Sequence, residues 1–250
     1  MFKTLVLMLC GFSSFSQNTL ILEKNQIGQI RTNVDQLTLD SLIMQDSSLL
    51  NFSGRKTMYL QINHLLVGKG CILEGSGENG RNGDILPYTN ATSARSAPVI
   101  RGDTGWNGRQ GTDVFITVKD LVLLDTLIIF VPGENGGNGT PAPSLNVINA
   151  RPGFGNNNSY PGYPGLGGNG GHGGDVMIVY SPSIEESLRR IAIVNHGGRA
   201  GLMGDLNPMN LILPPFSPFD QRTLVNDFRY VRKNRRDGTP GKVRMMKLKE

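Results

Sequence analysis

Glycine recurs at every third residue in several separate stretches of this chain, and this spacing restricts the fold more than any other feature. The longest stretch contains Gly162, Gly165, Gly168, Gly171 and Gly174. Four shorter tracts keep the same period, at residues 77–83, 102–111, 133–139 and 198–204, and glycines at 238 and 241 repeat it once more. A flexible linker has no reason to keep such a register, so we expect the tracts to be structured.

A period of three is typical of a left-handed polyproline-II-type helix, which has three residues per turn and rises ~3.1 Å per residue. Glycine at every third position leaves one face without side chains, so a neighbouring backbone can approach closely. The runs are short and separated, which argues against a three-chain collagen helix. We therefore expect polyglycine-II-type helices packed against one another within one chain, with backbone groups hydrogen-bonded between neighbours.

The segments between the tracts are rich in β-forming residues, and they repeat. Residues 58–83 and 114–139 align without a gap at an offset of 56 and share Gly-Glu-Asn-Gly-x-Asn-Gly at their ends. A third copy begins at Asp175 with VMIVY. The predicted fold is mainly β with little α-helix: repeated β-segments, solenoid-like or in a sandwich, alternate with Gly-X-X helices of the polyglycine-II type packed as an intramolecular bundle.

The first sixteen residues have the pattern of a secretory signal peptide. Lys3 precedes an apolar run from Leu5 to Phe12, and small residues follow at Ser14 and Ser16. The run is too short to span a bilayer as a helix. Cys10 raises the alternative of a lipid anchor, but Leu9 stands where a small residue normally precedes a lipid-modified cysteine. We favour cleavage before Gln17; the Ser-Phe-Ser-Gln ending resembles signals of Bacteroidota proteins.

The remaining chain is divided by its patterns into three parts. Residues 17–56 are predicted to form an N-terminal β-region, and residues 57–210 form three repeats (about 57–112, 113–174 and 175–210). Residues 211–250 are a basic segment with an expected short helix and closing strand. A further short helix is expected at residues 183–191, capped at Ser183 with Glu186 in the capping-box position. Cys71, the one cysteine outside the signal, is expected to be a small buried residue.

Positive charge is concentrated at the C-terminal end. The whole chain carries +5, whereas residues 220–250 contain ten Lys or Arg against four Asp or Glu. A basic segment suits an acidic or phosphate-rich surface, and a solvated helix face plus a strand is the alternative that we favour. An exported protein is not expected to bind nucleic acid.

The acidic residues do not have the pattern of a catalytic centre. Polysaccharide lyases and hydrolases need clustered carboxylates, whereas Asp84, Asp175 and Asp205 each follow a tract glycine, where they are expected to accept backbone N–H groups. Residues 170–178 match one copy of a nine-residue calcium repeat, but such sites need tandem copies. No histidine spacing indicates a metal site. We expect no enzymatic activity, no cofactor and no metal; a carbohydrate-active enzyme on a β-repeat scaffold is the alternative.

The tracts GENGRNG, GDTGWNGRQG and GYPGLGGNGGHGG resemble those of proteins built as polyglycine-II bundles. Bacteriophage tail-fibre tip adhesins, certain glycine-rich antifreeze proteins and bacterial collagen-like surface proteins share this feature. The resemblance is limited to the tracts, and it implies a packed glycine bundle with variable residues on its surface. An ice-binding role is disfavoured because regular rows of threonine are absent.

Four residues on or beside the tracts are candidates for ligand binding. Trp106, with Arg109 three residues later, and Tyr160 and Tyr163 beside Pro161 supply aromatic rings of the kind that stack on sugars. For Trp106 the interpretation that the sequence favours is that it packs against a neighbouring β-segment and anchors the bundle. Gly162, Gly165, Gly168, Gly171, Gly174 and Asp175 are assigned structural roles. The sequence thus favours an exported protein, extracellular, periplasmic or on the outer surface, which binds a glycan or cell-surface protein or has a structural role.

Overall fold

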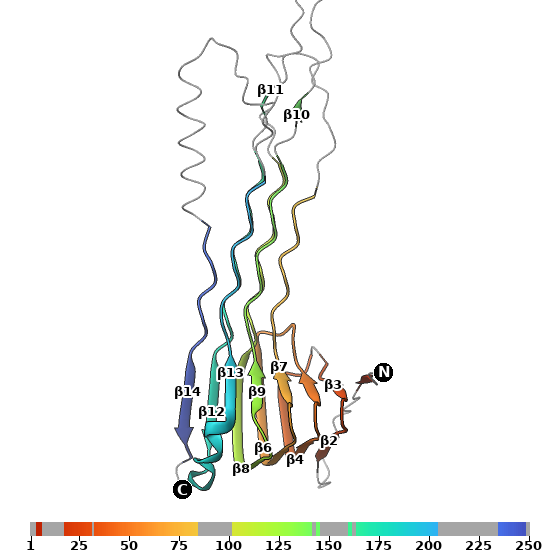
Figure 1. Ribbon diagram of the computed structural model, residues 1–250, viewed down its shortest axis with the longest axis vertical. Coiled ribbons are helices and arrows are strands. Elements are labelled where there is room, and N and C mark those ends of the chain that lie inside the picture. Colours follow the sequence, from red (N-terminus) through yellow and green to blue (C-terminus); the bar gives the residue numbers. More distant parts are fainter. Residues whose placement is uncertain are drawn as a thin grey trace, which may run out of the picture.

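The computed structural model describes residues 4–6, 18–31, 33–84, 102–141, 144–145, 160–161, 164–204 and 235–248. Two parallel six-stranded sheets form the base of the molecule (Figure 1). Sheet 1 contains, in spatial order, β1 (Thr4–Val6), β3 (Ile27–Gln29), β5 (Leu49–Asn51), β7 (Ile72–Glu74), β9 (Leu127–Phe130) and β13 (Ile191–Val194). Sheet 2 contains β14 (Val243–Lys247), β12 (Val176–Tyr180), β8 (Asp113–Leu123), β6 (Thr57–Val67), β4 (Gln36–Met44) and β2 (Thr19–Leu22).

Apart from β10 and β11, the chain alternates between the two sheets, so that each strand pairs with the next strand of its own sheet. This alternation is that of a parallel β-solenoid, in which one strand from each sheet makes one rung. The predicted mainly β fold is therefore confirmed, and the solenoid-like arrangement is the correct one of the two left open. A separate antiparallel pair, β10 (Ser144–Leu145) and β11 (Tyr160–Pro161), lies far from the sheets (Figure 1).

The strand register explains the internal repeat. In the first rungs, residues 22 or 23 apart pair, as in Leu20 with Leu42 and Leu37 with Leu60. Met58 instead pairs with Val114 and Ile72 with Ile128, so residues 56 apart are neighbours on adjacent rungs. The gap-free sequence alignment coincides with this register. The longer rungs contain the additional residues of the glycine tracts.

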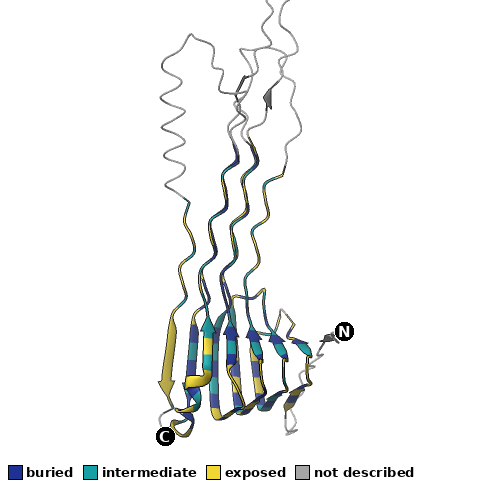
Figure 2. Cartoon of the chain, in the orientation of Figure 1, coloured by how far each residue is buried: buried dark blue, intermediate teal, exposed yellow. Residues whose placement is uncertain are grey.

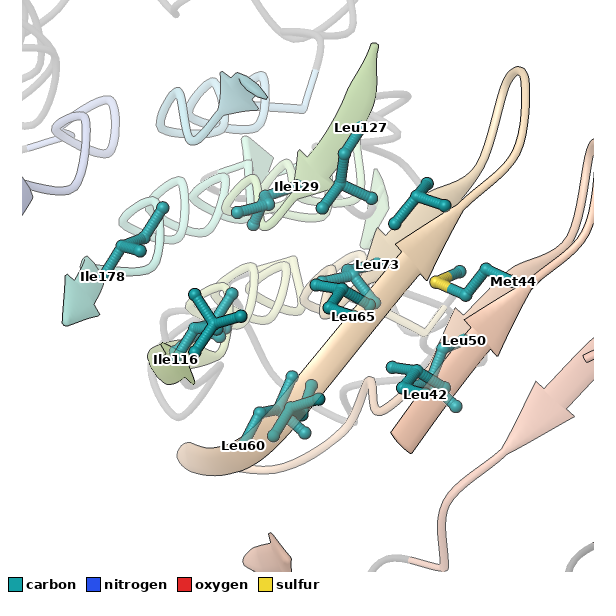
Figure 3. Close-up of a cluster of buried hydrophobic side chains, with 14 of the residues drawn as sticks. Leu42, Met44, Leu50, Leu60, Leu65, Leu73, Ile116, Leu127, Ile129 and Ile178 are labelled. Carbon is teal, nitrogen blue, oxygen red and sulfur yellow. The ribbon is translucent and has the colours of Figure 1, made fainter. Parts of the chain in front are cut away.

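The space between the sheets is filled by aliphatic side chains. In β6 the buried residues are Met58, Leu60, Ile62, Leu65 and Val67, whereas the residues between them face outward. Figure 3 shows such side chains from both sheets gathered in one cluster, among them Leu65 and Leu73. Burial of each large aliphatic side chain contributes about 1.5–3 kcal/mol, so the stacked rows hold the rungs together.

The turns from sheet 2 to sheet 1 repeat a left-handed residue. Asn25, Ser47 and Gly70 all have positive φ, at 59°, 58° and 64°, and they stand at corresponding positions of the first three rungs. Beside the last of these turns, Cys71 is fully buried, as expected, and its thiol donates to the carbonyl oxygen of Gln45 at 3.1 Å.

Six irregular segments lead from the sheets in one direction (Figure 1). Tract 1 (75–84), tract 3 (131–141) and tract 5 (195–204) follow β7, β9 and β13 of sheet 1. Tract 2 (102–112), tract 4 (164–175) and tract 6 (235–242) lead back into β8, β12 and β14 of sheet 2. Each long rung thus contains one outgoing and one returning tract, where the sequence suggested one tract per repeat. Buried residues concentrate in the tracts at the centre of the set (Figure 2).

The helix expected at residues 183–191 is replaced by two short 3-10 turns, η1 (Pro182–Ile184) and η2 (Ser187–Arg190). Ser183 lies inside η1, and neither turn has a side-chain cap, so the predicted capping box was wrong. Ile184 and Leu188 are buried and anchor this crossing against the core. The helix expected within residues 211–234 lies outside the described residues.

Candidate functional site at the first edge of the glycine bundle

The tracts form a hydrogen-bonded bundle in which the partner changes with each residue. In tract 3 every backbone N–H from Gly133 to Thr140 donates a hydrogen bond. Gly133, Gly136 and Gly139 donate to carbonyls of tract 5, and Glu134, Gly137 and Thr140 donate to carbonyls of tract 2. Asn135 and Asn138 donate to side chains of tract 1. The partner therefore rotates through three neighbours with a period of three residues.

Asparagine side chains connect the tracts of each layer. Asn79 Oδ1 accepts the N–H of Asn135 at 3.2 Å, and Asn135 Oδ1 accepts the N–H of Arg199 at 2.8 Å. The same arrangement joins Asn107, Asn169 and Arg236 in the other layer. Each Asn thus satisfies a backbone donor that the glycine spacing alone leaves unpaired.

Tract 4 carries more glycine than tract 2, and its additional glycines stand where a neighbouring backbone leaves no room for a side chain. Tract 4 lies between tracts 2 and 5 and carries two glycines per triplet. A Cβ on Gly168 would overlap the carbonyl oxygen of Trp106, and one on Gly170 would overlap that of Gly198. Tract 2 lies at the edge and keeps only one glycine per triplet, because one of its sides faces solvent.

At the edge of the bundle, some residues with large side chains occupy positions at which the adjacent interior tract has glycine. Asn107 and Asn169 are hydrogen-bonded across the layer, so Trp106 corresponds to Gly168 and Arg109 to Gly171. In the other layer, Arg81 corresponds to Gly137, whose Cβ would overlap the Arg81 carbonyl oxygen. We name this surface the first edge; it consists of Glu78, Arg81, Asp103, Trp106 and Arg109.

Trp106 is the most prominent side chain of the first edge. Its indole is 67% exposed, whereas its backbone is fixed on both sides: its N–H donates to Arg81 and its carbonyl accepts from Gly137, each at 2.8 Å. The favoured interpretation, that Trp106 packs against a β-segment, is not supported at this exposure. A rigid backbone that holds a large exposed aromatic ring is suited to stacking on a flat apolar partner such as a sugar face.

Charged groups flank the indole. Arg109 Nη1 lies 3.0 Å from Glu78 Oε2 in an exposed ion pair that joins tracts 1 and 2. Asp103 accepts the N–H of Asp84 through Oδ2 at 2.9 Å. The first edge therefore offers guanidinium donors and carboxylate acceptors beside one aromatic ring.

Glu134 occupies the position that corresponds to Glu78, 56 residues later, on a tract with more neighbours. Burial raises the pKa of its carboxyl group, and the nearby His196 only partly opposes this shift. Its backbone N–H donates to the carbonyl of Arg109, which places it directly behind the first edge.

The other predicted residues are placed as follows. Gly165, Gly168, Gly171 and Gly174 lie in tract 4, and a Cβ on each would overlap a carbonyl oxygen of tract 2. Asp175 Oδ1 accepts the N–H of Lys242 at 2.7 Å, so it bonds the neighbouring tract rather than the end of its own. The backbone of Tyr160, in β11, pairs with Leu145 of β10, far from the sheets (Figure 1), and its side chain lies outside the described residues. Gly162 and Tyr163 also lie outside them.

The described part of the chain contains no cluster of three or more His, Cys, Asp or Glu side chains that could hold a metal ion. His172, within the single calcium-like repeat, instead accepts the N–H of Thr239 through Nδ1 at 3.0 Å. An open hollow of about 280 Å³ beside sheet 2 is lined largely by aliphatic residues such as Leu66 and Leu124. Its one carboxylate, Asp46, accepts the N–H of Lys69.

Sequence reasoning found Trp106 and Arg109 but missed Arg81 and Glu78, which complete the first edge. The sequence does contain a signal for Arg81: when residues 58–83 are aligned with residues 114–139, Arg81 stands opposite Gly137. Within the described ranges, no helix has the length and apolarity needed to cross a membrane. In comparisons with protein-family models, curated proteins and solved structures, the chain matches none.

Proposed function

We propose that this is an exported, non-enzymatic surface or extracellular protein with a structural or adhesin-like binding role, built on a scaffold of polyglycine-II-type helices. The helix assignment is supported by the three-residue rotation of hydrogen-bond partners along tract 3. It is also supported by the backbone angles, because no glycine of the described tract residues has a φ in the left-handed range.

The observation that carries the binding role is the exposed Trp106 on a fixed backbone. A Cβ on Gly168, the equivalent residue of tract 4, would overlap the carbonyl oxygen of Trp106, so the large residue is confined to the edge. The Trp106 backbone is already fixed on both sides and therefore loses little conformational freedom on binding, which favours affinity. The ligand class proposed for the first edge is a glycan, with the sugar ring on the indole and its hydroxyl groups hydrogen-bonded to Arg109 and Glu78.

A glycan and whole-cell binding array tests this role with three proteins: wild type, Trp106→Ala and Leu202→Ala. Leu202 is a matched control, because it is 71% exposed on tract 5, at the other side of the bundle. We expect Trp106→Ala to bind about tenfold more weakly, as for the loss of about 1.4 kcal/mol of aromatic contact, and Leu202→Ala to bind normally. Equal binding by all three proteins contradicts the assignment of the first edge.

Export is tested separately by sequencing the N-terminus of the protein recovered from outside the cytoplasm of its native host. We expect mature chains that begin at Gln17, as the signal pattern predicts. Full-length chains retained in the cytoplasm would contradict the proposed localisation, whatever the glycan array shows.

A further inference from the structure

The second edge of the bundle, formed by tracts 5 and 6 and β14, differs in charge from the first. The asparagine and aspartate connections described above all end there. Asn79 and Asn135 are followed by Arg199, Asn107 and Asn169 by Arg236, and Asp113 and Asp175 by Lys242. Three of these acceptor series thus end on a cation, whereas the Asn82–Asn138 series ends on Leu202 and the hydrogen bond accepted by His172 comes from Thr239.

These cations are free to contact a partner. Arg199, Arg236 and Lys242 are exposed, as is Arg244 in the next position but one, and none of them forms an ion pair with a described residue. The other positive groups of this edge are occupied, since Lys247 pairs with Glu185 at 2.8 Å and Arg235 donates to Gly201.

The carboxylates beside these cations are engaged by backbone donors. Asp175 accepts the N–H of Lys242, and Asp237 accepts the N–H of Ala200, each at 2.7 Å. Both hydrogen bonds stabilise the bundle and hold the two side chains against it. The two carboxylates keep their negative charge, but the four exposed cations Arg199, Arg236, Lys242 and Arg244 outnumber them, so the net charge of the second edge is positive.

The cations also form a row. Arg236 and Lys242 stand six residues apart on one extended tract, which is about 19 Å at the ~3.1 Å rise of a three-residue helix. Arg244 continues the row into β14, whose five residues are all exposed (Figure 2). Arg199 lies alongside, because Gly238 on tract 6 donates to the carbonyl of Gly198.

We propose that the second edge binds a linear anionic polysaccharide, with carboxylate or sulfate groups placed along the row of Arg199, Arg236, Lys242 and Arg244. A straight and rigid row of cations fits an extended polymer better than a single compact anion, and contact with several charges releases several counterions. This surface is separate from the first edge, and its partner differs in charge from the neutral ring stacked on Trp106.

The test measures binding of the full chain to polygalacturonate, dextran sulfate, neutral dextran and inorganic polyphosphate over a range of salt concentrations. The edge variant carries Arg199→Gln, Arg236→Gln, Lys242→Gln and Arg244→Gln. One control of equal charge change replaces Lys24, Arg31, Lys56 and Lys69, which are exposed on the first rungs. A second control replaces Arg229, Arg232 and Lys233 in the adjoining basic segment.

We expect wild type and both controls to bind the two acidic polysaccharides and to ignore neutral dextran. The edge variant is expected to bind at least tenfold more weakly, with a shallower dependence on salt because fewer counterions are released. Unchanged binding by the edge variant, loss confined to the Arg229 variant, or binding to polyphosphate alone would each overturn the proposal. Circular dichroism checks that the edge variant is folded. If it is unfolded, the four substitutions are made singly instead. If none of the four single variants loses polysaccharide binding, the proposal is overturned as well.

Discussion

The carbonyl oxygen of Trp106 lies where a Cβ on Gly168 would stand. These two residues occupy equivalent positions on adjacent tracts, yet one is the largest side chain and the other has none. The difference arises from their neighbours, because tract 4 is covered on the side where tract 2 faces solvent. This relationship determines which substitutions the bundle tolerates.

Gly168→Ala is expected to destabilise the protein, since the added methyl group must displace a backbone carbonyl rather than a flexible side chain. Overpacking of this kind costs about 1–3 kcal/mol and more where the backbone cannot move. The measurement is the free energy of unfolding in urea. Trp106→Ala is the control at the equivalent edge position, with an expected change of less than about 0.5 kcal/mol. Equal losses in the two variants would show that the tracts are not closely packed.

Asn135→Ala removes the acceptor for the N–H of Arg199, at 2.8 Å in the native protein. The expected loss of stability is about 0.5–1.5 kcal/mol, the net contribution of one such hydrogen bond. Asn135→Asp keeps the acceptor oxygen and is expected to restore most of that loss. Thermal unfolding of both variants measures the effect, and an alanine variant as stable as wild type would argue against a role for the asparagine connections.

Glu134→Gln is expected to change how stability depends on pH. Burial raises the pKa of Glu134 in the folded protein, so the folded state binds the proton more tightly than the unfolded state. The wild type therefore loses stability as pH rises from the ordinary pKa of the carboxyl group to the raised value. The Gln variant lacks this loss, and its advantage over wild type should grow across that window and then stay constant.

Thermal unfolding between about pH 4 and about pH 8 tests this prediction, a range that brackets the usual titration of a carboxyl group. Glu78→Gln is the control, because it removes the exposed ion pair with Arg109 and should lower stability slightly at neutral pH. A Glu134→Gln variant that becomes less stable than wild type as pH rises would mean that His196 outweighs burial.

The sequence alone predicted the elements that depend on spacing. A period of three gave the glycine tracts, and the offset of 56 coincides with the register in which Met58 pairs with Val114. Alternating apolar residues gave the strands, because only one face of each is buried. These features are local or repeat at a fixed interval, which makes them visible without knowledge of the neighbours.

Other features depend on contacts between distant segments and could not be read in this way. Tract 6 has only Gly238 and Gly241, yet both donate to tract 5, and its edge position explains why two glycines are enough. Arg55 is buried and donates to the carbonyl oxygen of Ile30, although nothing in its sequence context distinguishes it from a surface arginine. The role of Arg81 in the first edge likewise requires knowledge that, among the described residues, no tract lies on the outer side of tract 1.

Residue-resolved amide hydrogen exchange tests the central claim, that the tracts form a bundle in which hydrogen-bond partners rotate every three residues. We predict strong protection of every amide from Gly133 to Thr140 in tract 3. In tract 1, at the edge, we predict protection only at the amides that donate hydrogen bonds, which are Gly75, Gly77, Gly80, Gly83 and Asp84. Rapid exchange throughout both tracts, or the same continuous protection in both, would contradict the account.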